Sequence, residues 1–185
     1  GHSLGEYTAL VCAQSMSFAD GLRLVSARGR YMQEAVPEGV GAMAAIVGLD
    51  DAAVEQACGR VVGLVTPANY NSIGQVVIAG ESAAVDAAVV EAKSLGAKIA
   101  KRIPVSVPSH CALMKPAAEK LNALLATIDI KSPCIPVINN VDVCVESNPD
   151  HIKAALVRQL CSPVQWVKTI ETLAMNGVTN IIECG

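Results

Sequence analysis

The sequence predicts an α/β fold in which a core of helices and strands is interrupted by a smaller unit. Just over half of the residues are apolar (52%), and 185 residues suffice for one sizeable domain. Strand-like and helical runs alternate outside residues 38–106, which favours a parallel sheet covered by helices. Inside that range the order is β-α-β-β-α-β, as in a ferredoxin-like subdomain. We therefore predict a core from residues 1–37 and 107–185, with a ferredoxin-like subdomain inserted at 38–106.

The first five residues, Gly1 to Gly5, read G-x-S-x-G, the pattern of a nucleophile elbow. In an elbow a serine occupies a sharp strand-to-helix turn, and the flanking glycines let the backbone turn tightly. Ser3 would be the nucleophile, and the backbone N–H of Leu4 would point at a developing oxyanion. The alternative is an ordinary glycine-rich helix start with Ser3 as its N-cap. Since no strand precedes the motif, we expect the chain to be an internal segment of a longer protein.

A capping-box pair, Ser17 and Asp20, opens a helix that we predict from about Ala19 to Ala35. Projected around a helix, Arg28 lies at the centre of an apolar stripe made of Leu24, Val25, Tyr31, Met32 and Ala35. An unpaired buried charge is very costly, so this arginine needs an anionic partner. A salt bridge to an Asp or Glu and a fork for a substrate carboxylate both fit the pattern.

Local signals place the remaining elements. Within the predicted subdomain we expect strands at 42–49, 61–69, 75–79 and 98–105, with helices at 50–58 and 82–95. After it we expect a helix ending near residue 127, a strand at 135–139, helices at 149–160 and from 162 to 176, and a final strand at 178–183. The last two helices have a proline at the first helical position, and Gly177 is the expected stop of the second.

Composition excludes several classes of function. A net charge of −3 and only 3% aromatic residues provide neither a basic nor a stacking surface, so no nucleic-acid partner is expected. No apolar run is long enough to span a bilayer. The seven cysteines are scattered and lack metal-ligand spacing, so we expect reduced thiols in a cytoplasmic protein and no metal site.

A serine nucleophile needs a base within hydrogen-bond reach, and three histidines are available. His2 adjoins Ser3, but neighbouring side chains diverge at an elbow. His151 lies in the first turn of a polar-ended helix, where a surface position is expected. His110 lies where the inserted subdomain rejoins the core, and such junctions favour binding sites. His110 is therefore the preferred base, and no carboxylate is obviously placed to complete a Ser-His-Asp triad.

Five motifs in order give the chain a resemblance to a known family. They are GHSLGEY at residues 1–7, RG followed by MQ at 28–33, NYN at 69–71, PVSVPSHCALM at 104–114 and SPVQW at 162–166. Over its whole length the chain resembles the malonyl-CoA:acyl carrier protein transacylases of bacterial type II fatty acid synthesis, as an internal fragment without the N-terminal segment. The resemblance implies an α/β-hydrolase-like core with the inserted ferredoxin-like subdomain.

The resemblance also implies roles. Ser3 would carry the malonyl group, His110 would be the base and then the acid, and the backbone carbonyl of Gln165 would hold the histidine ring. Arg28 would grip the malonyl carboxylate, and Leu4 would supply one oxyanion donor. Four further positions would support or shape the pocket: Met32, Asn69, Asn71 and Ser109.

Malonyl-CoA and the phosphopantetheine arm of acyl carrier protein would be substrates, with no cofactor, and the protein would be a monomer. The family's other oxyanion donor comes from a glutamine-containing loop that is not in this sequence, so we expect the segment alone to be inactive. Three alternatives stay open at this point: a serine hydrolase or thioesterase, the acyltransferase domain of a polyketide synthase, and a carrier-docking scaffold without activity.

Overall fold

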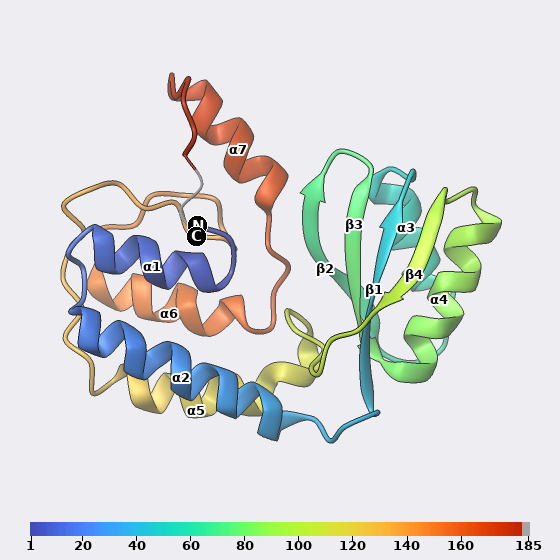
Figure 1. The fold of residues 1–185 in the computed structure, drawn as a ribbon, viewed down its shortest axis with the longest axis horizontal. Helices are drawn as coiled ribbons and strands as arrows, with labels where there is room; N and C mark the ends of the chain where they lie inside the picture. Colours follow the sequence, from blue (N-terminus) through green and yellow to red (C-terminus); the bar gives the residue numbers. More distant parts are fainter. Residues whose placement is uncertain (183–185) are drawn as a thin grey trace.

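A computed structural model describes residues 1–182 of the chain, with seven α-helices and four β-strands among them. The helices are α1 (Leu4–Cys12), α2 (Phe18–Ala35), α3 (Asp51–Gly59), α4 (Ser82–Ser94), α5 (Lys115–Leu125), α6 (Pro149–Gln159) and α7 (Trp166–Met175). The strands are β1 (Gly41–Val47), β2 (Val65–Ser72), β3 (Gln75–Glu81) and β4 (Ile99–Ile103), and a 3₁₀ turn at Ala112–Met114 precedes α5. Figure 1 shows the sheet with α3 and α4 on one side of the molecule and the other helices opposite it.

The four strands form one antiparallel sheet in the order β2-β3-β1-β4. The predicted order β-α-β-β-α-β is thus present between residues 41 and 103. Alternate residues of β1 face opposite ways, as the two-residue period of a strand requires. Ala44 and Ile46 pack into the cluster under α3 and α4, whereas Met43 packs on the other face against Cys111 and Leu113 of the helical part. The second contact attaches the sheet to the helices.

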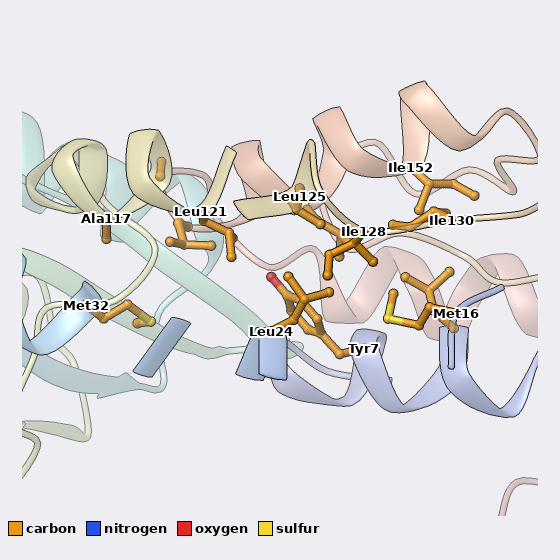
Figure 2. Close-up of a cluster of buried hydrophobic side chains, with 14 of the residues drawn as sticks. Tyr7, Met16, Leu24, Met32, Ala117, Leu121, Leu125, Ile128, Ile130 and Ile152 are labelled. Carbon is orange, nitrogen blue, oxygen red and sulfur yellow. The ribbon is translucent and has the colours of Figure 1, made fainter. Parts of the chain in front are cut away.

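The helices α1, α2, α5 and α6 enclose the second and larger core. Figure 2 shows its side chains between these helices, with Tyr7 and Leu24 facing Leu121, Leu125 and Ile128. Tyr7, Leu24, Leu121 and Leu125 are almost wholly buried. The apolar stripe predicted on α2 faces this core, with Leu24 and Met32 buried. The polar face of α2, including the Arg30–Glu34 pair, is exposed.

Three of the local capping signals correctly predicted a helix end. Ser17 Oγ accepts a hydrogen bond from the Asp20 N–H at the start of α2 (3.0 Å). Asn148 Oδ1 accepts the Asp150 N–H (2.8 Å) at the start of α6, where Pro149 is the first helical residue. Gly177 has φ of 80° just after α7, as a left-handed stop requires.

Two predictions about backbone pairing are wrong within residues 1–182. Residues 135–139 form no strand, because only an isolated antiparallel bridge joins Ile138 to Val145, and the described part of 178–183 forms none either. A strand exists only where a neighbour supplies its hydrogen bonds, so the predicted parallel sheet does not form within these residues. Residue 183 lies outside the described residues.

The last helix begins later than predicted. Val164 pairs with β2, donating to the Ala68 carbonyl (2.9 Å) and accepting from the Tyr70 N–H (3.0 Å). These bonds hold residues 162–165 extended, so α7 starts at Trp166 and Ser162 is not its N-cap. None of the helices described in residues 1–182 is long and apolar enough to cross a membrane.

Candidate active site

Ser3 occupies a sharp turn immediately before α1. Its backbone angles, φ of 50° and ψ of −104°, lie outside the regions favoured by residues other than glycine, as at the strained nucleophile of an elbow. A Cβ at Gly1 would lie 2.1 Å from the carbonyl oxygen of Gly5, so only glycine fits there, whereas a Cβ at Gly5 would meet nothing within 4 Å. The first glycine of the motif is therefore required sterically. Ser3 makes no side-chain cap to α1, which removes the N-cap interpretation.

His110 lies beside Ser3, although 107 positions separate them in the sequence. The distance between Ser3 Oγ and His110 Nε2 is 2.9 Å, which is hydrogen-bond contact. On the other side of the ring, Nδ1 donates to the backbone carbonyl of Gln159 at 2.7 Å. This bond fixes the tautomer with the proton on Nδ1, which leaves Nε2 free to accept the serine proton.

Burial keeps the His110 ring neutral. The side chain is 4% exposed, and this desolvation lowers its pKa to about 4, with the nearby Arg28 cation acting in the same direction. The hydrogen bond to Gln159 opposes the shift but does not cancel it. At neutral pH the imidazole is therefore available as a base.

The sequence-based choice of Gln165 as the residue that holds the histidine is wrong. The Gln165 carbonyl accepts the N–H (3.0 Å) and the hydroxyl (2.9 Å) of Thr169 in the first turn of α7, and its N–H donates to the Asn140 carbonyl (3.0 Å). These bonds occupy the Gln165 backbone. The residue whose carbonyl accepts from His110 Nδ1 is instead Gln159, the last residue of α6.

Arg28 is buried (6% exposed) and points at the same serine from α2. Its Nη2 donates to Ser3 Oγ at 2.9 Å and to Gln159 Oε1 at 3.3 Å, and the guanidinium lies 5.7 Å from the centre of the Tyr7 ring. Among residues 1–182 no carboxylate lies within ion-pair distance of it, and its Nε has no hydrogen-bond partner there. The sequence allowed two explanations of the buried arginine, an internal salt bridge or a site for a substrate carboxylate. The internal salt bridge is not formed within these residues.

Comparison with known proteins assigns the family. The model of the acyl transferase domain family matches residues 1–184. The chain belongs to this family. A malonyl CoA-acyl carrier protein transacylase of Escherichia coli K12 is 59% identical over 187 residues, covering 100% of this chain and 60% of that protein. The chain thus spans about three fifths of the length of the relatives it matches.

Solved structures agree with this assignment. An acyl-carrier-protein S-malonyltransferase from Burkholderia pseudomallei superposes with a TM-score of 0.98 at 52% identity, covering 100% of this chain and 61% of that one. A malonyl-transacylase in complex with its type II polyketide acyl-carrier protein superposes with a TM-score of 0.95 at 54% identity, covering 96% and 58%.

The structure also gives the surroundings of the other predicted site residues of this acyl transferase segment. Leu4 begins α1, and among the hydrogen bonds described for residues 1–182 none uses its N–H. Asn71 Oδ1 accepts from His2 Nε2 at 2.9 Å, and Asn69 is buried in β2 beside Val164. Asn71 therefore contacts the elbow itself.

The two residues predicted to shape the acyl pocket, Ser109 and Met32, are not bonded to Ser3 in the described residues. Ser109 is half-buried and donates its N–H to the Val107 carbonyl (3.1 Å) in the turn before His110. Met32 lies on α2 C-terminal to Arg28, packed in the larger core. Neither makes a hydrogen bond to Ser3 or His110 in the described residues, so their pocket roles stay predictions.

Sequence reasoning missed three buried polar residues of the acyl transferase site: Glu6, Asn140 and Gln159. Glu6 is next to the buried Tyr7 on α1, and Gln159 continues the buried Ile152–Leu156 face of α6. A polar residue on an apolar helix face is the same signal that singled out Arg28, so both could have been found. Asn140 lies in an irregular segment and carries no such signal.

Proposed function

We propose that the intact protein transfers a malonyl group from malonyl-CoA to the phosphopantetheine thiol of acyl carrier protein, through a malonyl ester on Ser3. The observation that carries this proposal is the buried Arg28, whose Nη2 lies 2.9 Å from Ser3 Oγ and whose guanidinium has no carboxylate partner in residues 1–182. A cation in that position favours an acyl group that carries its own carboxylate. The names of the relatives support the same substrate.

In the first half-reaction, Ser3 Oγ attacks the thioester carbonyl of malonyl-CoA while His110 Nε2 takes the hydroxyl proton. The carbonyl oxygen becomes an oxyanion, towards which the Leu4 N–H is directed as one donor. The carbon–sulfur bond then breaks, and the coenzyme A thiolate takes the proton from His110. The serine is left as a malonyl ester and the histidine is neutral again.

In the second half-reaction, the thiol of the carrier's phosphopantetheine arm attacks the same ester carbonyl. His110 accepts the thiol proton and returns it to Ser3 Oγ as the ester bond breaks. The Gln159 carbonyl, which accepts from Nδ1 at 2.7 Å, stabilises the imidazolium in both halves and takes the place of a triad carboxylate. This chemistry requires no cofactor beyond the two substrates, the thioester malonyl-CoA and the thiol of the phosphopantetheine arm.

Arg28 supplies the selectivity. In a malonyl ester a single methylene separates the ester carbonyl from the free carboxylate, so a guanidinium beside Ser3 Oγ is within reach of that carboxylate. Binding a planar carboxylate by two parallel N–H groups suits arginine. An acetyl group leaves the buried cation unpaired, which is costly, and acetyl-CoA should therefore react poorly.

We propose the finer fold assignment on the same basis. Residues 38–106 form a ferredoxin-like subdomain, supported by the strand order β2-β3-β1-β4, and residues 1–37 and the described part of 107–185 belong to an α/β-hydrolase-like core. The partner is an acyl carrier protein, as in the carrier complex of the relative described above. We further propose a cytoplasmic monomer.

The test is mass spectrometry of the intact gene product after brief incubation with malonyl-CoA. A malonyl adduct should form on the wild type, vanish in Ser3→Ala and fall strongly in Arg28→Ala. Arg30→Ala is the matched control, because Arg30 lies on the same helix with its side chain 67% exposed. The proposal fails if the wild type forms no adduct, if Arg30→Ala loses as much as Arg28→Ala, or if the adduct is only hydrolysed when carrier protein is added.

A further inference from the structure

Two side chains hold the backbone of Ser3, one bonded to its N–H and the other to its carbonyl. The Ser3 N–H donates to Asn140 Oδ1 at 2.6 Å, and the Ser3 carbonyl accepts from Gln159 Nε2 at 3.1 Å. A serine with φ of 50° persists only where its surroundings over-determine it. These two side-chain bonds, together with the Glu6 N–H that donates to the same carbonyl (3.1 Å), restrain the backbone so that the hydroxyl stays turned towards His110.

Both restraining residues are in turn bound to one atom. Glu6 Oε2 accepts the backbone N–H of Asn140 at 2.9 Å and the Nε2 of Gln159 at 2.8 Å. Glu6 is 2% exposed and lies in the first turn of α1, three residues after Ser3. A single carboxylate oxygen therefore ties together the segments that hold Ser3 from opposite sides.

Gln159 extends this connection to the rest of the site. Its backbone carbonyl orients the His110 ring (2.7 Å), and its Oε1 accepts from Arg28 Nη2 (3.3 Å). The amide nitrogen of Gln159 donates to Glu6 Oε2 and to the Ser3 carbonyl, so the orientation of this side chain depends on the Glu6 acceptor. A displacement of this side chain would act directly on Ser3 and Arg28, and a shift of the Gln159 backbone that accompanied it would act on His110.

We propose that Glu6 is a positioning residue for the proposed acyl transfer, acting through Asn140 and Gln159 to hold Ser3 and His110 in the reactive arrangement. This inference rests on the proposed function for its assay. Packing alone does not account for the residue, because an apolar side chain would fill the same space without the cost of burying a carboxyl group. Burial raises the pKa of Glu6, and the hydrogen bonds from Gln159 and Asn140 oppose that rise.

The experiment compares Glu6→Ala with Leu10→Ala in the intact gene product, measuring melting temperature together with kcat and KM for malonyl transfer. Leu10 is the matched control, since it is equally buried on α1 (2% exposed) and its apolar side chain makes none of the hydrogen bonds that join Glu6, Asn140 and Gln159. Below both melting temperatures, Glu6→Ala should lower kcat by about 100-fold with little change in KM, because small misplacements of reacting groups cost about that much. Leu10→Ala should lower the melting temperature and keep its kcat.

Two further variants keep the inference testable if Glu6→Ala fails to fold. Both hydrogen bonds converge on one oxygen, so Glu6→Gln, which keeps a carbonyl oxygen, should recover most of the lost kcat. Asn140→Ala should lower kcat as Glu6→Ala does, and the double variant should be little worse than the poorer single one, because coupled residues are non-additive.

The inference is overturned if kcat falls equally in Glu6→Ala and Leu10→Ala, if Glu6→Gln is as slow as Glu6→Ala, or if the Glu6 and Asn140 effects multiply. A wild type that forms no malonyl adduct would instead overturn the proposed function, so the two failures are distinguishable.

Discussion

Replacing Arg28 with lysine separates the charge of the proposed carboxylate clamp from its geometry. The guanidinium presents Nε and Nη2 on one edge, and the structure leaves Nε without a partner in residues 1–182 while Nη2 lies 2.9 Å from Ser3 Oγ. That edge can bind both oxygens of a carboxylate beside the serine. Lysine keeps a positive charge but offers a single nitrogen, so one of the two parallel hydrogen bonds is lost.

The expected size of the effect follows from that one bond. A hydrogen bond to a charged group contributes about 1.5–3 kcal/mol, and each 1.4 kcal/mol is a factor of ten, so kcat/KM for malonyl-CoA should fall by about 10- to 100-fold. For acetyl-CoA, which has no free carboxylate, kcat/KM should change little. The assay is carrier-protein acylation with each thioester at limiting concentration. Equal fractional losses for the two substrates would refute the clamp, because they would show that Arg28 acts on the serine alone.

Three further predictions concern stability. The pKa of His110 is lowered to about 4 by burial, against about 6.5 when unfolded, so stability should be lost as pH falls from about 6.5 towards 4, by up to about 3 kcal/mol. Denaturant unfolding at several pH values should show this loss relative to His110→Gln, and an unchanged difference would contradict it. Leu121→Ala should cost about 2–5 kcal/mol because the side chain is fully buried, whereas Leu22→Ala, 52% exposed, should cost less than about 1 kcal/mol in the same measurement. Asn148→Ala should cost about 1 kcal/mol by removing the cap on the Asp150 N–H, and thermal unfolding without any loss would show that the cap is replaced by solvent.

Signals confined to a few neighbouring residues predicted the local structure. The cap at Ser17, the proline after Asn148 and the left-handed Gly177 all act through bonds or dihedral angles within one helical turn. The β-α-β-β-α-β order was likewise visible, since each element has its own hydrophobic period and the connections are short. The start of α7 was predicted too early because β2 pairs with Val164, which no neighbouring residue reveals.

In the candidate site, too, local signals were predictable and long-range contacts were not. The sequence by itself determined the elbow, the buried Arg28 and the choice of His110, because each carries a local signature: a motif, a charge in an apolar stripe, or a junction between subdomains. Only the tertiary structure decided that Gln159 rather than Gln165 orients His110. It also decided that Asn140 and Gln159 bond the serine backbone and that both are bonded in turn to Glu6. The bonds from Gln159 and Asn140 to Ser3 span more than 130 positions, and a backbone carbonyl is the same in every residue. Such contacts depend on how helices pack, which the side-chain pattern of one segment does not specify.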